Sequence, residues 1–241
     1  MVNPERLSDL FMSLVGIDSV SREEAEISNY LQALLSSMGA EIRVDDAAAG
    51  VAGNAGNLIA RFAGNAAVPP LMLNAHMDTV EPGRGVAPTL EDGVFRSDGR
   101  TILGADDKSA IAIIIETIRI LQERGLPHGP LEVVLTVCEE IGLMGGKHLR
   151  FEWIDAKQGY ALDASNTEGI VTRAPAANRF EIRVYGKDAH AGAAPEKGIN
   201  AILLASRAIA RLNLGRIDDE TTCNIGTIEG GTATNIIPDR V

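Results

Sequence analysis

Apolar and polar positions up to about residue 174 alternate between the spacing of helices and the spacing of strands. Helical periodicity predicts helices over residues 3–17 and 22–38, and over the mostly apolar residues 106–124, which end at Gly125. Short apolar runs bounded by turn residues predict strands over residues 41–46, 57–62, 70–75, 131–137 and 158–163. This alternation predicts an α/β fold with a mixed or parallel central sheet flanked by helices.

Several local patterns refine this prediction. Residues 70–75 are apolar enough to be buried on both faces, and residues 90–99 read as a short hairpin. The small residues 47–57 predict a loop, and residues 144–151 a helix. Ser21 and Glu24 have the spacing of a capping box at the start of the second helix.

The pattern changes after residue 174. Residues 178–187 alternate strictly and predict a half-solvated strand, residues 198–214 predict an amphipathic helix, and residues 221–230 and 235–241 predict strands. We therefore expect two domains, residues 1–174 and a smaller α+β domain, residues 175–241. Because the last strand pattern stops at Val241, we expect this second domain to be incomplete in the chain.

Composition narrows the class of protein. A chain of 241 residues with 45% hydrophobic residues can bury a sizeable core. The net charge of -11 argues against nucleic acid or an anionic membrane as a partner. Two distant cysteines, Cys138 and Cys223, indicate neither a disulfide framework nor a cysteine zinc site. The sequence shows no signal peptide and no membrane-spanning apolar run, so we expect a cytoplasmic protein.

Seven side chains able to bind metal stand at the ends of predicted elements: His76, Asp78, Asp106, Asp107, Glu139, Glu140 and Asp163. Each alone has an ordinary explanation, such as a helix cap or a solvated turn. Together, however, most of them follow strands, and the carboxyl ends of strands form sites in α/β sheets. So many carboxylates at one edge would repel each other without cations. Imidazole and carboxylates suit zinc, with cobalt or manganese as alternatives, and a bridging carboxylate would allow a two-metal site.

Four strings in this order resemble the M20 family of dinuclear zinc peptidases: HMDTV, GADDKSAIA, EEIGLMGGKHL and HAGAAPEKGINAI. They are most similar to its peptidase T (tripeptidase)-like branch, and the resemblance runs from about residue 5 to the end of the chain. It implies a zinc-exopeptidase fold whose second domain is a lid and dimerisation domain. It also implies a homodimer that hydrolyses short peptides with two divalent ions per site.

The resemblance also assigns roles to metal ligands. His76 and Asp163 would hold one ion, Asp106 would bridge both, and Glu140 would bind the second. Asp78 would hydrogen-bond the His76 ring and fix its tautomer. The family often has a cis peptide after the bridging aspartate, which here is the Asp106–Asp107 bond.

Three further residues would act on the substrate. Glu139 would be the general base that activates a metal-bridging water. His190 would stabilise the oxyanion, commonly in the site of the partner subunit, and Asn235 would contact the substrate. Glu139 and Glu140 are neighbours with different roles, which requires an irregular backbone after the preceding strand.

One part of the family pattern has no counterpart here. The second metal site uses a further histidine downstream, and none of the four histidines matches it, so we expect that residue beyond Val241. Two alternatives to an aminotripeptidase-like enzyme stay open. One is an N-acyl-amino-acid amidohydrolase on the same scaffold, and the other is a non-catalytic binding protein of the same fold.

Overall fold

The computed structural model describes residues 1–164, 168–174 and 176–241. The chain divides into two compact units, Met1–Thr167 and Glu168–Val241. The change in sequence pattern lies somewhat later, after residue 174. No helix in the described ranges is both long and apolar enough to cross a membrane.

A five-stranded mixed sheet forms the centre of the first unit. Its strands lie in the order β1 (Glu41–Val44), β2 (Leu58–Phe62), β6 (Leu131–Thr136), β3 (Leu71–His76) and β7 (Gly159–Ala161). The pairs β1–β2 and β2–β6 are antiparallel, whereas β6, β3 and β7 run parallel to one another. The mixed α/β sheet predicted from the sequence is therefore confirmed, and the carboxyl ends of three parallel strands meet at one edge.

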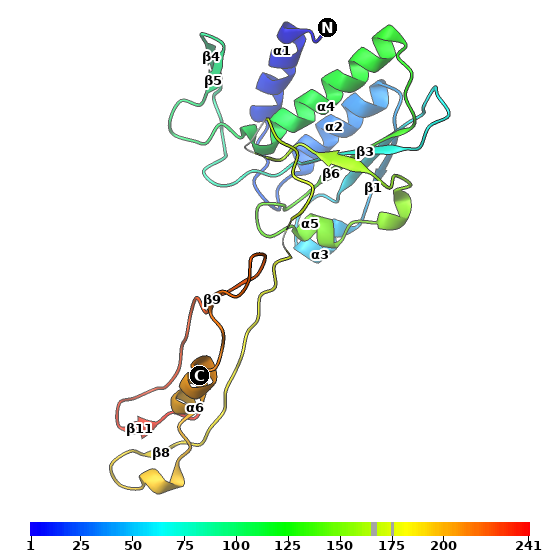
Figure 1. Ribbon diagram of the computed structural model, residues 1–241. Coiled ribbons are helices and arrows are strands. Elements are labelled where there is room, and N and C mark those ends of the chain that lie inside the picture. Colours follow the sequence, from blue (N-terminus) through cyan, green and yellow to red (C-terminus); the bar gives the residue numbers. More distant parts are fainter. Residues whose placement is uncertain (165–167, 175) are drawn as a thin grey trace. The chain divides into compact units, whose positions relative to one another are not determined.

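Three long helices cover one face of this sheet: α1 (Pro4–Val15), α2 (Ala25–Ser37) and α4 (Ala105–Arg124) (Figure 1). Their apolar faces bury Leu14, Leu31 and Ile111 in one core with residues of β2, β3 and β6. Every residue of β6 is buried, as expected for a central strand. In β3, full burial is reached only at its carboxyl end, and residues 71–74 are half-buried.

Local predictions in this unit had mixed outcomes. The hairpin is confirmed as β4 (Thr89–Glu91) paired with β5 (Val94–Arg96). Part of the predicted loop is helix α3 (Ala47–Val51), which contacts the short helix α5 (Met144–Lys147). A single 3-10 turn, η1 (Phe151–Trp153), follows.

The predicted capping box of the second helix is wrong. Helix α2 begins at Ala25, and neither Ser21 nor Glu24 caps it through its side chain. The Ala25 N–H donates instead to Asn54 Oδ1, at 2.9 Å. Ser21 and Glu24 both turn inward to partners far along the chain, so spacing alone misassigned them.

The second unit contains helix α6 (Ala201–Ile209), capped by Asn200, and very short strands. The strand pairs are β8 (Ala189–His190) with β11 (Ile236–Ile237), and β9 (Gly215–Arg216) with β10 (Thr222–Cys223). A 3-10 turn, η2 (Pro195–Lys197), lies between β8 and α6.

The long strand predicted over residues 178–187 is wrong. Within the described chain, this segment pairs only at isolated bridges, Tyr185 with Arg240 and Lys187 with Ile199. Its apolar side chains Phe180 and Ile182 are mostly exposed. Alternation predicts a strand only where one face becomes buried, and here neither face does.

Candidate metal centre

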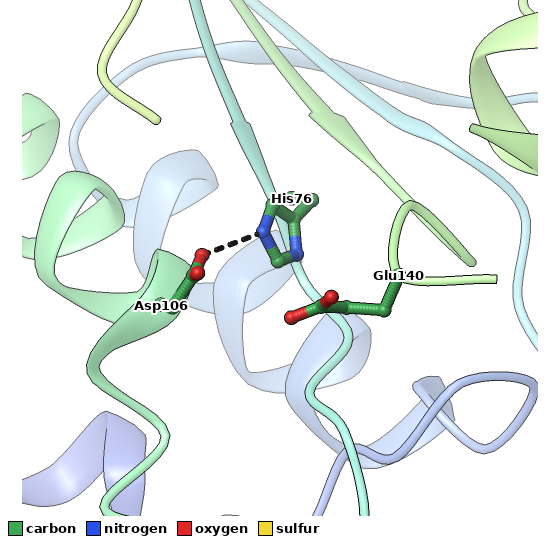
Figure 2. A group of neighbouring side chains, drawn as sticks. All are labelled: His76, Asp106 and Glu140. Carbon is green, nitrogen blue, oxygen red and sulfur yellow. Dashed lines mark hydrogen bonds and ion pairs between the residues drawn. The ribbon is translucent and has the colours of Figure 1, made fainter. Parts of the chain in front are cut away.

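The parallel strands bring the predicted metal-binding side chains to one edge of the sheet. His76 ends β3, Glu139 and Glu140 follow β6, and Asp163 follows β7. Asp106 lies at the start of α4, where its backbone departs from helical angles. Figure 2 shows Asp106 and Glu140 converging on the His76 ring, with Asp106 Oδ1 3.0 Å from His76 Nε2.

Potential ligand atoms gather here in three overlapping groups, each within 4.8 Å. The groups are His76, Asp106 and Glu140; His76, Glu139 and Asp163; and Asp106, Asp107 and Asp163. Every group contains carboxylates, and two of the three also contain the His76 imidazole. This donor set fits a divalent ion such as zinc.

The His76 ring is buried and held from both sides. Its Nδ1 lies 2.9 Å from the backbone carbonyl oxygen of Asp78 and 3.4 Å from the Asp78 carboxylate. The carbonyl is therefore the nearer acceptor, where the sequence had indicated the carboxylate. Burial disfavours the imidazolium, but the Asp78 carboxylate and the charge of Asp107 outweigh it and raise the pKa of His76 to about 10.

The other ionisable groups of the centre are closely spaced carboxyls, and the pKa values of three of them are raised. Burial, reinforced by the charges of Asp163 and Asp106, raises the pKa of Asp107 to about 7, although His76 opposes this shift. Burial also raises the pKa of Glu139 and of Glu140. A bound divalent cation would stabilise the ionised form of these carboxylates and offset their mutual repulsion.

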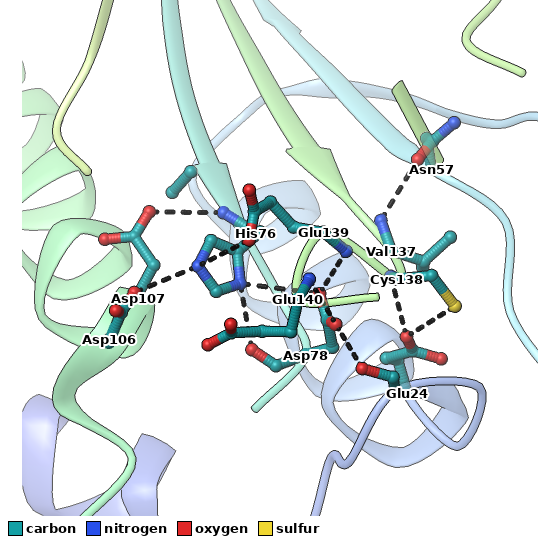
Figure 3. Close-up of polar contacts among 12 residues, drawn as sticks. Glu24, Asn57, His76, Asp78, Asp106, Asp107, Val137, Cys138, Glu139 and Glu140 are labelled. Carbon is teal, nitrogen blue, oxygen red and sulfur yellow. Dashed lines mark hydrogen bonds and ion pairs between the residues drawn. The ribbon is translucent and has the colours of Figure 1, made fainter. Parts of the chain in front are cut away.

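The backbone after β6 is irregular, as the different roles of Glu139 and Glu140 require. Cys138 has a left-handed φ of 52°, which costs a side-chain-bearing residue about 1 kcal/mol. The Glu139 N–H donates to Asp78 Oδ1 (2.8 Å), and the Glu140 N–H donates to Asp78 Oδ2 (3.2 Å). Figure 3 shows Asp78 beneath this turn, so that one carboxylate fixes both glutamates.

Sequence analysis did not predict the contacts that four residues make around this centre. Asp107 Oδ2 accepts from the backbone N–H of His76 at 3.2 Å. Ser21 Oγ donates to Asp78 Oδ2 at 2.6 Å. Asn57 and Glu24 are buried and hold the backbone of the turn. Of these four, only Asp107 was among the side chains that the sequence predicted to meet at the sheet edge. The Asp106–Asp107 peptide is cis, which confirms that prediction.

His190 and Asn235 lie beside each other in the second unit. His190 in β8 pairs with Ile236, and the Ala191 N–H donates to the Asn235 carbonyl oxygen at 2.9 Å. His190 Nδ1 is an acceptor for the N–H groups of Gly192 and Ala193, at 3.2 and 3.1 Å. In the neutral ring, the proton therefore sits on Nε2.

Comparison with known proteins places this fold among metallopeptidases of the M20 and M28 type. Residues 57–193 match the family described as Peptidase family M28, and residues 176–241 match the M20 peptidase dimerisation domain. The chain belongs to the M20 family of peptidases, in its peptidase T-like branch.

Solved structures support this assignment. Aminopeptidase PepT from Bacillus cereus has a TM-score of 0.85 and 44% identity, over 99% of this chain and 65% of that one. A tripeptidase from Staphylococcus aureus has a TM-score of 0.82 and 38% identity, over 100% of this chain and 65% of that one.

Curated relatives agree with the structures. The uncharacterized protein YqjE of Bacillus subtilis is 47% identical over 100% of this chain and 65% of its own length. Peptidase T of Escherichia coli is 35% identical over 51% of this chain and 30% of its own length. The chain thus spans less than two thirds of the relatives it matches.

Proposed function

We propose that this chain carries the catalytic centre of an aminotripeptidase-like metallopeptidase that hydrolyses peptide bonds in short peptides. The observation that carries the proposal is the convergence of His76, Asp106, Glu140 and Asp163 beside Glu139 at one sheet edge. Names of similar proteins, aminopeptidase and tripeptidase, support the substrate class.

His76, Asp106, Glu140 and Asp163 would hold two divalent ions, zinc or alternatively cobalt or manganese. Asp106, like His76 and Asp163, belongs to two of the three ligand groups, and the family resemblance assigns the bridging role to Asp106. When bound, such ions polarise the scissile carbonyl and lower the pKa of water. The chain's own contribution is to hold these ligands in place, chiefly through the contacts of Asp78 and Asp107 to His76.

Glu139 is the residue best placed to move protons. Its carboxylate reaches to 3.9 Å from His76 Nε2 and remains partly exposed, so water and a peptide can approach it. Burial raises its pKa, which brings a carboxylate closer to the range of an effective base. We propose that it takes a proton from the attacking water and later delivers it to the leaving amine.

His190 and Asn235 would act on the peptide from the second unit. With its proton on Nε2, the neutral His190 ring can donate a hydrogen bond to the oxyanion of the transition state. The adjacent Asn235 offers an amide for the peptide backbone. The dimerisation-domain match supports a homodimer, in which this unit would serve the partner's site. Cytoplasmic localisation stays a prediction.

The Glu139→Ala variant tests the proposed base. We expect turnover of an unblocked tripeptide to fall by about 100-fold or more, because the proton acceptor is lost. Zinc content, measured by atomic absorption, should remain that of the wild type. The exposed Glu152 provides the control, since Glu152→Ala should leave both quantities unchanged. Retained turnover in Glu139→Ala would remove Glu139 as the base.

A substrate panel tests the reaction class. Unblocked tripeptides should be hydrolysed, whereas N-acetyl amino acids should be poor substrates. The reverse preference would favour the amidohydrolase alternative. Failure to bind any divalent ion, together with no turnover, would favour a non-catalytic binding protein.

A further inference from the structure

Four successive backbone N–H groups, from Val137 to Glu140, donate to buried side chains from other parts of the chain. Val137 N donates to Asn57 Oδ1 at 3.1 Å, and Cys138 N donates to Glu24 Oε1 at 3.0 Å. The next two N–H groups donate to Asp78. Figure 3 shows these contacts, with Asn57 above the turn and Glu24 and Asp78 below it.

Glu24 holds the residue on which the turn depends. Cys138 has the left-handed φ of the turn, and both its N–H and its thiol contact Glu24 Oε1, the thiol at 3.3 Å. Glu24 Oε1 also accepts from the Arg22 N–H at 3.0 Å. The carboxylate therefore ties the start of α2 to the residue just before the catalytic glutamates.

Burial makes this arrangement unusual for a structural glutamate. Glu24 is fully buried, and its Oε2 has no hydrogen-bond partner among the described residues. An isolated carboxylate oxygen inside a protein is unfavourable, so packing and α2 capping alone do not explain a glutamate here. In addition, Asn54 supplies the hydrogen bond to the first N–H of α2.

We propose that Glu24 is a positioning residue, which sets the backbone turn at Cys138 and thereby aims Glu139 and Glu140. This inference rests on the proposed function for the roles of those two glutamates. The property that matters is the length of the side chain and its acceptor oxygen at Oε1. Its charge is secondary, because the groups that Oε1 contacts are neutral donors.

Glu132 is a matched control for Glu24. It is also a buried glutamate whose carboxylate accepts backbone N–H groups, those of Asp155 and Ala156 at 2.9 to 3.2 Å. However, it lies near the amino end of β6, whereas the metal centre lies beyond the carboxyl end. Loss of Glu132 therefore reports the effect of removing a buried carboxylate without disturbing the turn.

The experiment compares Glu24→Ala, Glu24→Gln and Glu132→Ala in the full chain. We expect Glu24→Ala to lower kcat for a tripeptide by about 10- to 100-fold, with KM within about threefold of the wild type. Competition of the metal-free protein with a chromophoric chelator should show zinc affinity weakened about tenfold. Glu24→Gln keeps the acceptor and should restore most of both quantities. Glu132→Ala should lower the unfolding temperature but leave kcat and zinc affinity unchanged.

Two results would overturn the proposal. One is wild-type kcat and zinc affinity in folded Glu24→Ala, and the other is an equal loss in Glu132→Ala. If Glu24→Ala does not fold, Glu24→Asp replaces it. Activity and zinc affinity should then follow side-chain length, with Gln above Asp, and the opposite order would refute the role. If the wild type binds zinc but cleaves no peptide, the proposed function fails while the zinc comparison still tests Glu24.

Discussion

At the residue scale, Asp78 links the two halves of the centre. Its backbone oxygen faces the His76 ring, while its fully buried carboxylate accepts from two successive N–H groups and from Ser21. Burial would raise the pKa of this carboxyl, but the contacts with His76, Ser21 and the Glu139 N–H outweigh it and lower the pKa. Asp78 is therefore ionised in the structure. Both of its carboxylate oxygens face donors, and a protonated carboxyl would turn one of these acceptors into a donor.

The Asp78→Asn variant tests this role. An asparagine offers one carbonyl oxygen, so its amide group must face either the Glu139 N–H or the Glu140 N–H. We expect kcat for a tripeptide to fall by about 10- to 100-fold and zinc affinity to weaken, as for other supports of metal ligands. Ser21→Ala should have a smaller effect, because both backbone contacts remain. Equal losses in the two variants would contradict this account.

At the element scale, the short helix α5 closes against the turn after β6. The Gly145 N–H donates to the Val137 carbonyl oxygen, and the Gly145 carbonyl accepts from Asn57 Nδ2. A Cβ added at Gly145 would lie 2.1 Å from the Val137 oxygen and 2.6 Å from Asn57 Oδ1. At Gly146, the next residue of the same helix, a Cβ would meet nothing within 4 Å.

These two glycines make a matched pair of alanine substitutions. Gly145→Ala should reduce the free energy of unfolding by about 1 to 3 kcal/mol, because the new methyl group overlaps backbone that cannot move without disturbing β6. Gly146→Ala should leave it unchanged or raise it by up to about 1 kcal/mol. Urea unfolding followed by circular dichroism measures both. Similar values for the two variants would show that the approach of α5 to the turn is looser than the structure has it.

At the scale of the whole molecule, the first unit collects its charged centre from four separate segments of chain. The helices on one face of the sheet and the fully buried strand β6 supply the rigid core that holds these segments. The cost is a cluster of carboxyls at one edge, where burial, reinforced by the charges of neighbouring carboxylates, raises the pKa values of Asp107, Glu139 and Glu140. Folding of this unit should therefore be coupled to binding of divalent cations.

Thermal unfolding of the metal-free protein with and without zinc tests this coupling. At a free zinc concentration of about 100 times the dissociation constant, the folded state should gain about 2.7 kcal/mol. For a chain of this size, that gain corresponds to a rise in unfolding temperature of about 5 to 10 °C. His76→Ala should abolish most of the rise, since His76 belongs to two of the three ligand groups. A rise of the same size in that variant would place the stabilising ion elsewhere.

The sequence by itself determined the sheet, its covering helices and the residues that meet at the sheet edge. Those features follow from local periodicity and from the rule that parallel strands end together, so His76, Glu140 and Asp163 were found without coordinates. The cis bond at Asp106–Asp107 was reached through family resemblance rather than through any local pattern.

Only the tertiary structure decided what holds that edge in place. Glu24 and Cys138 are 114 positions apart, and Asn57 and Val137 are 80 apart, so no local pattern links them. Local spacing even misled, since Ser21 and Glu24 fit a helix cap but serve the turn instead. The predicted strand over residues 178–187 failed for the same reason, because alternation gives a strand only when tertiary packing buries one of its faces.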